Sequence, residues 1–319
     1  DVVIGIGTAN ADVSGSNLSV QRNQVTAEAR NNDASNGLAF SNGLATLGTS
    51  AAVSNLQSSS AAVQATVATY MAVSVPATTA AVDTSNLTAT DNRALGLAVG
   101  NSASNSLGAT ATNLSGNANI AAASGGSNWT TPALTTNADY GVSNRQAHTG
   151  DTTSTVNATV AIDADGAPVT AGTASVTGNS AQSIAQSNSA SNAATLGATN
   201  ITGVTGAVAS VQVSQGEMVS ATSNAATPAN VSFAVRALSI DSTPVTVSDN
   251  AVLASAGRNE AFNSLSASAT TISGGGKGNN ASAYVAGVVT TGADYSVMNV
   301  QQAAGGVSAT ANPGVIGVI

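Results

Sequence analysis

Catalytic chemistry in this sequence would have to start from His148, the single histidine, with Asp151 three residues further on. A nucleophilic triad needs a serine, a histidine and a carboxylate in one constellation, and a hydrolase of the elbow type presents its serine in a G-x-S-x-G turn. The sequence contains no such turn. We therefore expect His148 to be a surface loop residue and the protein not to be an enzyme.

The sequence gives equally little support for metal and phosphate sites. Asp163 and Asp165 in IDADGAP resemble the start of a calcium loop, but the distal ligands and the bidentate glutamate are missing. A D-x-D-G hairpin turn is the preferred interpretation, with calcium as the alternative. SGGGKGNN around Lys277 lacks the hydroxyl residue that follows the lysine of a phosphate loop, so a loop without ligand is predicted. No cofactor is expected.

Composition limits the partners. Charged residues make up 7% of the chain, the net charge is −8, and the seven Lys and Arg residues are scattered along the sequence. Nucleic-acid binding requires clustered cations, so that class is set aside. There is no cysteine, which excludes disulfides and thiolate metal sites. No apolar run reaches the length needed to span a bilayer.

The residue types favour β structure. Aromatic residues make up only 3%, and the hydrophobic content is dominated by small and β-branched side chains. Such side chains suit thin, tightly packed β layers. Apolar positions alternate with period two, as at Val231, Phe233 and Val235, and helical spacing is not sustained.

Two short motifs recur along the chain. The pattern N-x-A-x-N-x-L begins at Asn32, Asn101, Asn188 and Asn259, at spacings of 69, 87 and 71 residues. A second pattern, V-x-x-x-Q, is assigned to Val20, Val142, Val211 and Val297. Recurrence of this kind is typical of repeat architectures.

The repeats predict one elongated domain over residues 1–319, an all-β β-solenoid built from about four degenerate super-repeats. Each super-repeat would hold several coils of about 20 residues, giving about 15 coils stacked at about 4.8 Å. A pair of antiparallel β-sandwiches and a stacked-hairpin β-roll are the alternatives. Asparagines at equivalent positions would form ladders or occupy turns at the corners. The residues proposed for these positions are Asn32, Asn36, Asn101, Asn105, Asn113, Asn188, Asn192, Asn200, Asn259 and Asn263.

The two ends are more aliphatic than the body, in DVVIGIG (1–7) and PGVIGVI (313–319). An open stack must be capped, or its edges will pair with another chain. These segments are therefore interpreted either as capping strands or as the joints of head-to-tail assembly. The assembly residues would be Val2, Val3, Ile4, Ile6, Val315, Ile316, Val318 and Ile319.

The repeats NSASNSL and VQVSQ, set among small residues, resemble those of bacterial secreted β-solenoid surface proteins. The families in question are curli-type functional-amyloid fibre subunits and holdfast-anchor proteins. The resemblance implies a structural protein at the cell surface, with copies of itself and surface polysaccharide as partners. The absence of cysteine and the start at Asp1 favour export followed by signal-peptide removal.

The expected function is that of a self-assembling extracellular fibre subunit or cell-surface anchor without catalysis. A carbohydrate-binding adhesin module, with Tyr140 or Tyr295 stacking on a sugar, is the first alternative. The second is an ice-binding protein with a flat threonine face, suggested by TAT at Thr88 and Thr110. A polysaccharide lyase would need clustered charged residues, which the sequence lacks.

Overall fold

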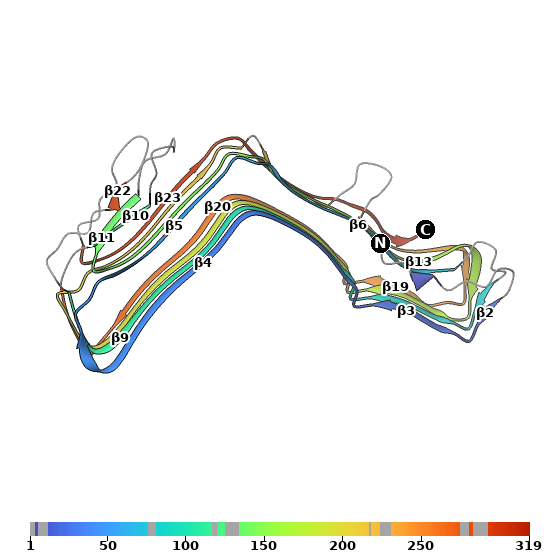
Figure 1. Ribbon diagram of the computed structural model, residues 1–319. Coiled ribbons are helices and arrows are strands. Elements are labelled where there is room, and N and C mark those ends of the chain that lie inside the picture. The colour runs from blue at the N-terminus through green and yellow to red at the C-terminus, as the bar shows by residue number, and fades with distance from the viewer. Residues whose placement is uncertain are drawn as a thin grey trace.

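The computed structural model describes residues 4–5, 12–75, 81–116, 120–124, 134–216, 218–223, 231–274, 281–282 and 293–319. Every regular element in these ranges is a β-strand. Figure 1 shows a long, bent body in which two layers of strands run side by side, with both labelled ends of the chain close together near β6 and β13.

The longest strands form a parallel sheet, here called the long sheet. Its strands are β4 (Gln24–Leu47), β9 (Arg93–Ser115), β15 (Ser180–Thr202) and β20 (Ala251–Ser268), in the order β20-β15-β9-β4, with β21 (Thr271–Ser273) also paired to β15. A second parallel sheet, the facing sheet, lies against it. Its strands are β5 (Ala51–Ser59), β12 (Tyr140–His148), β16 (Gly206–Ser214) and β23 (Tyr295–Ala303), in the order β23-β16-β12-β5.

Two further parallel sheets complete the body. The small sheet contains β3 (Asn17–Gln21), β8 (Asn86–Thr90), β14 (Thr173–Thr177) and β19 (Val245–Ser248). The nine-stranded sheet contains β1 (Ile4–Gly5), β2 (Val13–Ser14), β6 (Val63–Ser74), β7 (Val82–Asp83), β13 (Thr152–Thr170), β17 (Met218–Ser223), β18 (Val231–Asp241), β24 (Gly306–Ala311) and β25 (Pro313–Val318).

A small antiparallel sheet of β10 (Ile120–Ser124), β11 (Leu134–Ala138) and β22 (Ala281–Ser282) contacts the facing sheet through β10 and β11. The strands β12 and β16 are buried along their whole length. They contact the long sheet as well as β10 and β11, so both of their faces are covered.

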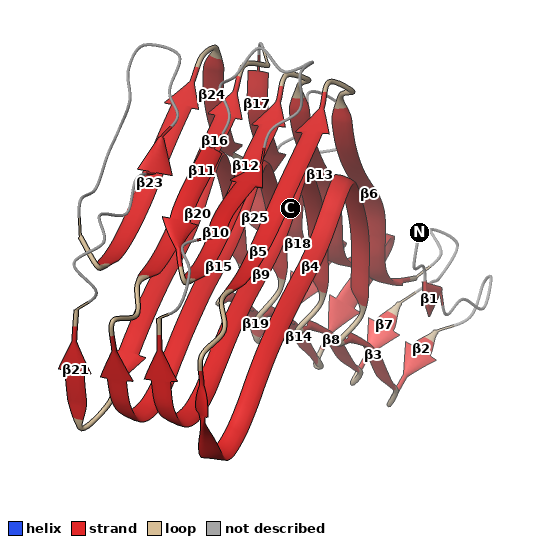
Figure 2. Ribbon diagram, turned by 60° about the vertical axis from the view of Figure 1, so that its left-hand side comes forward, coloured by secondary structure: helices blue, strands red, loops and turns tan. Residues whose placement is uncertain are grey.

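The chain runs through the small, long, facing and nine-stranded sheets in that order four times, and we call each run a pass. The first pass contains β3 to β6, and the fourth contains β19 to β25. Equivalent residues of successive passes are direct neighbours, as in the row Asn32, Asn101, Asn188 and Asn259. The stack is therefore only four strands deep, while each strand of the long sheet is up to 24 residues long (Figure 2).

The predicted β-solenoid is wrong. Its coils of about 20 residues do not occur, because hydrogen-bonded neighbours in the long sheet lie 69, 87 and 71 residues apart. The strands instead form four separate parallel sheets. The period-two pattern predicted strands correctly, but it does not report how long a strand runs before the chain turns. The antiparallel sandwich and the β-roll are also excluded, since the strands within the long, facing, small and nine-stranded sheets pair in parallel.

The interior is built from rows of small and aliphatic residues. Two rows of the long sheet are alanine in all four passes, one at Ala29, Ala98, Ala185 and Ala256 and the other at Ala34, Ala103, Ala190 and Ala261. A row of the facing sheet is valine throughout, at Val53, Val142, Val208 and Val297. Small side chains let the two sheets approach closely, so amide side chains can bridge the space between them.

Candidate functional site

Identical asparagines form a hydrogen-bonded row across the long sheet. Asn32 Nδ2 donates to Asn101 Oδ1 at 2.7 Å, Asn101 Nδ2 to Asn188 Oδ1 at 2.8 Å, and Asn188 Nδ2 to Asn259 Oδ1 at 2.8 Å. Parallel strands in register place equivalent side chains one strand spacing apart, which suits an amide ladder. Every donation runs toward the fourth pass, so this ladder has a direction.

The second hydrogen of each amide crosses to the facing sheet. Asn101 Nδ2 donates to the Ala147 carbonyl at 2.9 Å, and its neighbour Asn188 donates to the Val213 carbonyl at 2.9 Å. The outer members behave alike, since Asn32 donates to Ser58 at 3.0 Å and Asn259 to Gln302 at 2.7 Å. Asn101 is fully buried, and both of its amide hydrogens are satisfied. The row therefore joins neighbouring passes and also joins two sheets.

The other predicted asparagines are brought together in the same way. In the second row Asn36 donates to Asn105 at 2.9 Å, Asn105 to Asn192 at 2.8 Å, and Asn192 to Asn263 at 2.7 Å. Asn200 Nδ2 donates to Asn113 Oδ1 at 2.8 Å, a pair confined to the two middle passes. All ten residues lie inside strands, and none of them has a positive φ. The structure thus places them in ladders and not at turns.

Two further ladders were not predicted from the sequence. One joins Asn23, Asn92, Asn179 and Asn250, whose Nδ2 to Oδ1 distances are 2.9, 3.0 and 2.9 Å. The other joins Gln57, Gln146, Gln212 and Gln301, with Nε2 to Oε1 distances of 2.7, 2.8 and 3.1 Å. The glutamine ladder belongs to the V-x-x-x-Q motif, whose matching copies start at Val53, Val142, Val208 and Val297. The assignments to Val20 and Val211 were wrong, because short motifs recur by coincidence among so few residue types.

The first and fourth passes leave open edges on opposite sides of the stack. The strands β4 and β5 end their sheets on one side, and β20 and β23 end them on the other. Apolar side chains are exposed there: Val208 of the third pass is 1% exposed, whereas its row neighbour Val297 of the fourth pass is 48% exposed. We call these sides the first-pass face and the fourth-pass face. Each presents edge strands whose outward backbone groups can pair with another chain.

The predicted assembly residues at the chain ends have different surroundings. Val315, Ile316 and Val318 lie in β25, pair with β18 and are 37%, 48% and 54% exposed. The Ile319 N–H donates to the Val235 carbonyl at 2.9 Å. The backbone of Ile4 pairs with Val73 at the open edge of β6. Val2, Val3 and Ile6 lie outside the described residues.

Tyr140 and Tyr295 occupy one row of the facing sheet, in the order Ala51, Tyr140, Gly206, Tyr295. Tyr140 is fully buried, and burial together with the charge of Asp139 raises its pKa to about 12. A Cβ added at Gly206 would meet Tyr295 Cδ1 at 3.2 Å, so the glycine makes room for the ring. Tyr140 is therefore an interior residue and has no free face for a sugar.

His148 is buried, contrary to the expected surface loop. Its Nε2 lies 3.1 Å from Thr152 Oγ1, and Asp151 Oδ1 accepts the Met218 N–H at 2.8 Å. Burial lowers the pKa of His148, with smaller opposing effects from Asp151 and Ser59. Its hydrogen-bonding partner is thus a threonine, and the nearby carboxylate is engaged by the backbone.

Acidification from pH 7 to pH 5 is expected to destabilise the fold through His148. Because its pKa is lowered in the folded chain, the unfolded chain takes up the proton more readily. The stability is complete above the ordinary histidine pKa of about 6.5 and falls below it, by at most about 1.4 kcal/mol per pH unit. Urea unfolding at both pH values measures the effect, and His148→Gln should remove this slope. An equal slope in the variant would contradict the assignment.

The other candidate sites do not gather ligands. The Tyr70 hydroxyl donates to Asp163 Oδ2, and the side chain of Asp165 lies outside the described residues. Within the described ranges no three His, Cys, Asp or Glu side chains come together as metal ligands. Lys277 is outside the described residues. The row of Thr110 contains Ser41, Gly197 and Ser268, and that of Thr88 contains Ser19, Ser175 and Thr246, so neither row is threonine throughout.

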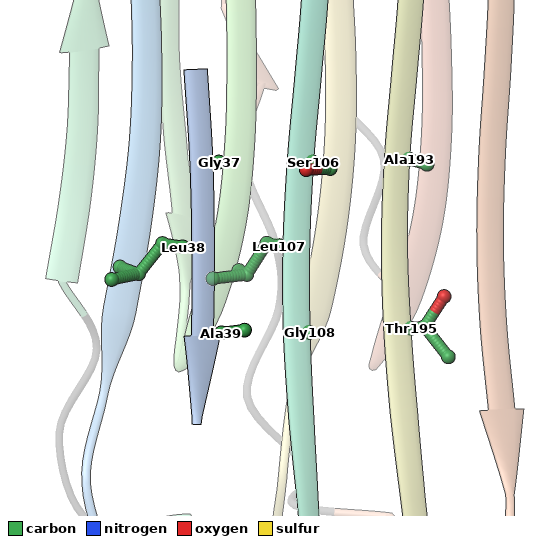
Figure 3. Close-up of a pocket in the computed structure, with 8 residues that line it drawn as sticks. All are labelled: Gly37, Leu38, Ala39, Ser106, Leu107, Gly108, Ala193 and Thr195. Atoms are coloured by element: carbon green, nitrogen blue, oxygen red, sulfur yellow. The ribbon is translucent and has the colours of Figure 1, made fainter. Parts of the chain in front are cut away.

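A hollow on the outer face of the long sheet is lined by small and uncharged residues (Figure 3). They are Gly37, Leu38, Ala39, Ser106, Leu107, Gly108, Ala193 and Thr195. None of these lining residues is titratable.

In the described part of the chain no helix is both long enough and apolar enough to cross a bilayer. Comparison with protein-family models, curated proteins and solved structures finds no match.

Proposed function

We propose that this chain is a structural protein that assembles with copies of itself into a fibre or surface layer outside the cell. The observation that carries the proposal is the pair of open faces. Within the described part of the chain, β4 on one side and β20 on the other have no further strand beside them, over 24 and 18 residues. Soluble proteins normally shorten, charge or cover such edges.

The character of these edges supports assembly. Among the first- and fourth-pass strands of the long sheet, charged side chains are confined to Glu28, Arg30 and Asp33 in β4 and to Arg258 and Glu260 in β20. Arg258 is buried and donates to the carbonyls of Gly216 and Gly306 at 2.9 and 2.8 Å. Few charges therefore oppose the approach of a second copy, and the exposed Leu253 and Val297 gain from burial.

The location at a bacterial surface rests on the sequence. The repeats are like those of fibre subunits and surface anchors, and a chain without cysteine has no thiol that an oxidising environment could cross-link. A surface polysaccharide is a further partner under this proposal, as the material to which such a fibre would attach.

Purified protein incubated for days is expected to form filaments in negative-stain electron microscopy. If each copy contributes its four strands to a continuous stack, the axial repeat should be about 19 Å per copy, with a 4.8 Å reflection along the fibre axis. The protein concentration should be varied so that a critical concentration is obtained. A chain that stays monomeric by light scattering at every concentration tested would overturn the proposal.

A further inference from the structure

The asparagine ladders end in complementary groups at the two faces. At the first-pass face, the amide nitrogens of Asn32 and Asn36 donate inside the chain, so Oδ1 is the acceptor left at this end of each ladder. At the fourth-pass face, Asn259 and Asn263 accept from the third pass through Oδ1, so their Nδ2 groups lie at the donor end. Asn259 Nδ2 donates to the Gln302 carbonyl at 2.7 Å and reaches the Gln212 carbonyl only at 3.5 Å, which leaves one of its hydrogens weakly bound. One face thus presents acceptors at the positions where the other presents donors.

The glutamine ladder runs in the opposite direction and reaches one pass further. Gln57 donates to the Ser102 carbonyl at 2.7 Å, Gln146 to Ser189 at 2.9 Å, and Gln212 to Glu260 at 2.7 Å, each time across to the following pass of the long sheet. Gln301 would need a fifth pass to repeat this contact. The residue at that position in a following copy is Asp33, which shares its row with Ser102, Ser189 and Glu260.

Side-chain size alternates across the passes in a way that a second copy continues. Tyr140 lies between Ala51 and Gly206, whereas Tyr295 has Gly206 on one side and the open face on the other. A following copy would place its Ala51 beside Tyr295. The row Phe40, Ala109, Leu196, Ala267 has the same alternation, and its next member would again be Phe40.

From these three observations we infer that the fourth-pass face of one copy docks on the first-pass face of a second copy, in the same orientation and in register, so that all four ladders continue across the joint. This inference rests on the proposed function and specifies its geometry. The donor ends of Asn259, Asn263 and Asn250 would meet the acceptor ends of Asn32, Asn36 and Asn23. Joining two like faces would oppose donor to donor or acceptor to acceptor.

The proposed register would bring opposite charges together at one site of the joint and like charges together at another. Arg22, Asp91, Gly178 and Asp249 directly follow the last strand residues of the small sheet, and Arg22 and Asp91 pair at 4.0 Å. Asp249 would meet the Arg22 of the next copy in the same way. Glu260 would face Asp33, a like charge; Arg30 pairs with Glu28 and also lies 3.7 Å from Asp33.

Engineered cysteines can test the register, since the chain has none of its own. Ser35 and Phe262 are the exposed end members of one outward row, so the joint would set their Cα atoms about 4.8 Å apart, within disulfide reach. The Ser35→Cys, Phe262→Cys protein should form disulfide-linked ladders on oxidation. In the matched control, Ser35→Cys with Ser266→Cys, the residues are offset by four positions, roughly 13 Å, and should not link.

The outcomes distinguish a failure of the proposed joint from a failure of the proposed function. Filaments with linked ladders in the first variant, and few links in the control, support the inference. Filaments that link equally in the control, or that link through Phe262→Cys alone, would overturn the register or the orientation while leaving self-assembly intact. Absence of filaments in the unmodified protein would overturn the proposed function itself.

Discussion

Replacing Asn101 with alanine is expected to lower the free energy of unfolding by about 3 to 5 kcal/mol. The change removes three hydrogen bonds and leaves three groups without their partner: the amide of Asn32, the Oδ1 of Asn188 and the Ala147 carbonyl. Each buried polar group left unsatisfied costs about 1 to 3 kcal/mol, and the partly exposed Asn32 costs least. Urea unfolding followed by circular dichroism measures the loss.

Asn17→Ala is the matched control. Asn17 also pairs with an asparagine of the next pass, since Asn86 Nδ2 donates to Asn17 Oδ1 at 2.7 Å, but this pair is exposed. Water can replace the lost partner, so the change should stay within about 0.5 kcal/mol. Similar losses in Asn17→Ala and Asn101→Ala would mean that ladder hydrogen bonds add little beyond side-chain packing.

Replacing Asn263 with aspartate is expected to raise the critical concentration for assembly by about 10- to 100-fold. The aspartate can still accept the hydrogen bond from Asn192, so the single copy keeps its ladder. At the joint, however, a carboxylate would face the Oδ1 of Asn36 in the next copy, where a donor is required. Leaving a charged group without a donor at a closed joint costs about 1.4 to 3 kcal/mol. Sedimentation of assembled protein over a concentration series gives the value.

Ser266→Asp places the same charge on the same edge strand, on a side chain that is exposed. That carboxylate can remain in water, so assembly should weaken by less than about threefold. Assembly of Asn263→Asp should also recover relative to the unmodified protein near pH 3, where an ordinary aspartate is protonated and can donate. Equal effects of the two substitutions would show that charge, and not ladder continuity, controls the joint.

The asparagine rows could be found in the sequence because each row repeats one residue type and the pattern N-x-A-x-N keeps two inward positions in phase. The motif copies at Asn101 and Asn188, 87 residues apart in the sequence, are direct strand neighbours. The path between these positions could not be deduced in the same way. A strand of 24 residues and four short ones separated by turns have the same alternation, so the length of a pass was misjudged.

The open faces were beyond the reach of sequence reasoning for a related reason. Leu38 and Leu107 are equivalent in register, yet Leu38 of the first pass is 37% exposed and Leu107 of the second pass is 2% exposed. Exposure here depends on which pass carries the residue, and that is known only when the passes are stacked. The terminal segments were predicted as caps or joints because they are aliphatic, although the larger open edges belong to β4 and β20.

The position of β1 has a consequence for how a stack could begin. Ile4 pairs with Val73 on the first-pass side, and Val318 closes the same row on the other side, after Ile162 and Val235. In a continuous stack the place beside Val73 would belong to the Val318 of the preceding copy. The chain's own opening strand already occupies that place, so each new joint requires one strand to be exchanged for another. Such a latch would slow the addition of every copy, and each joint of the fibre would be less stable by the lost pairing of β1.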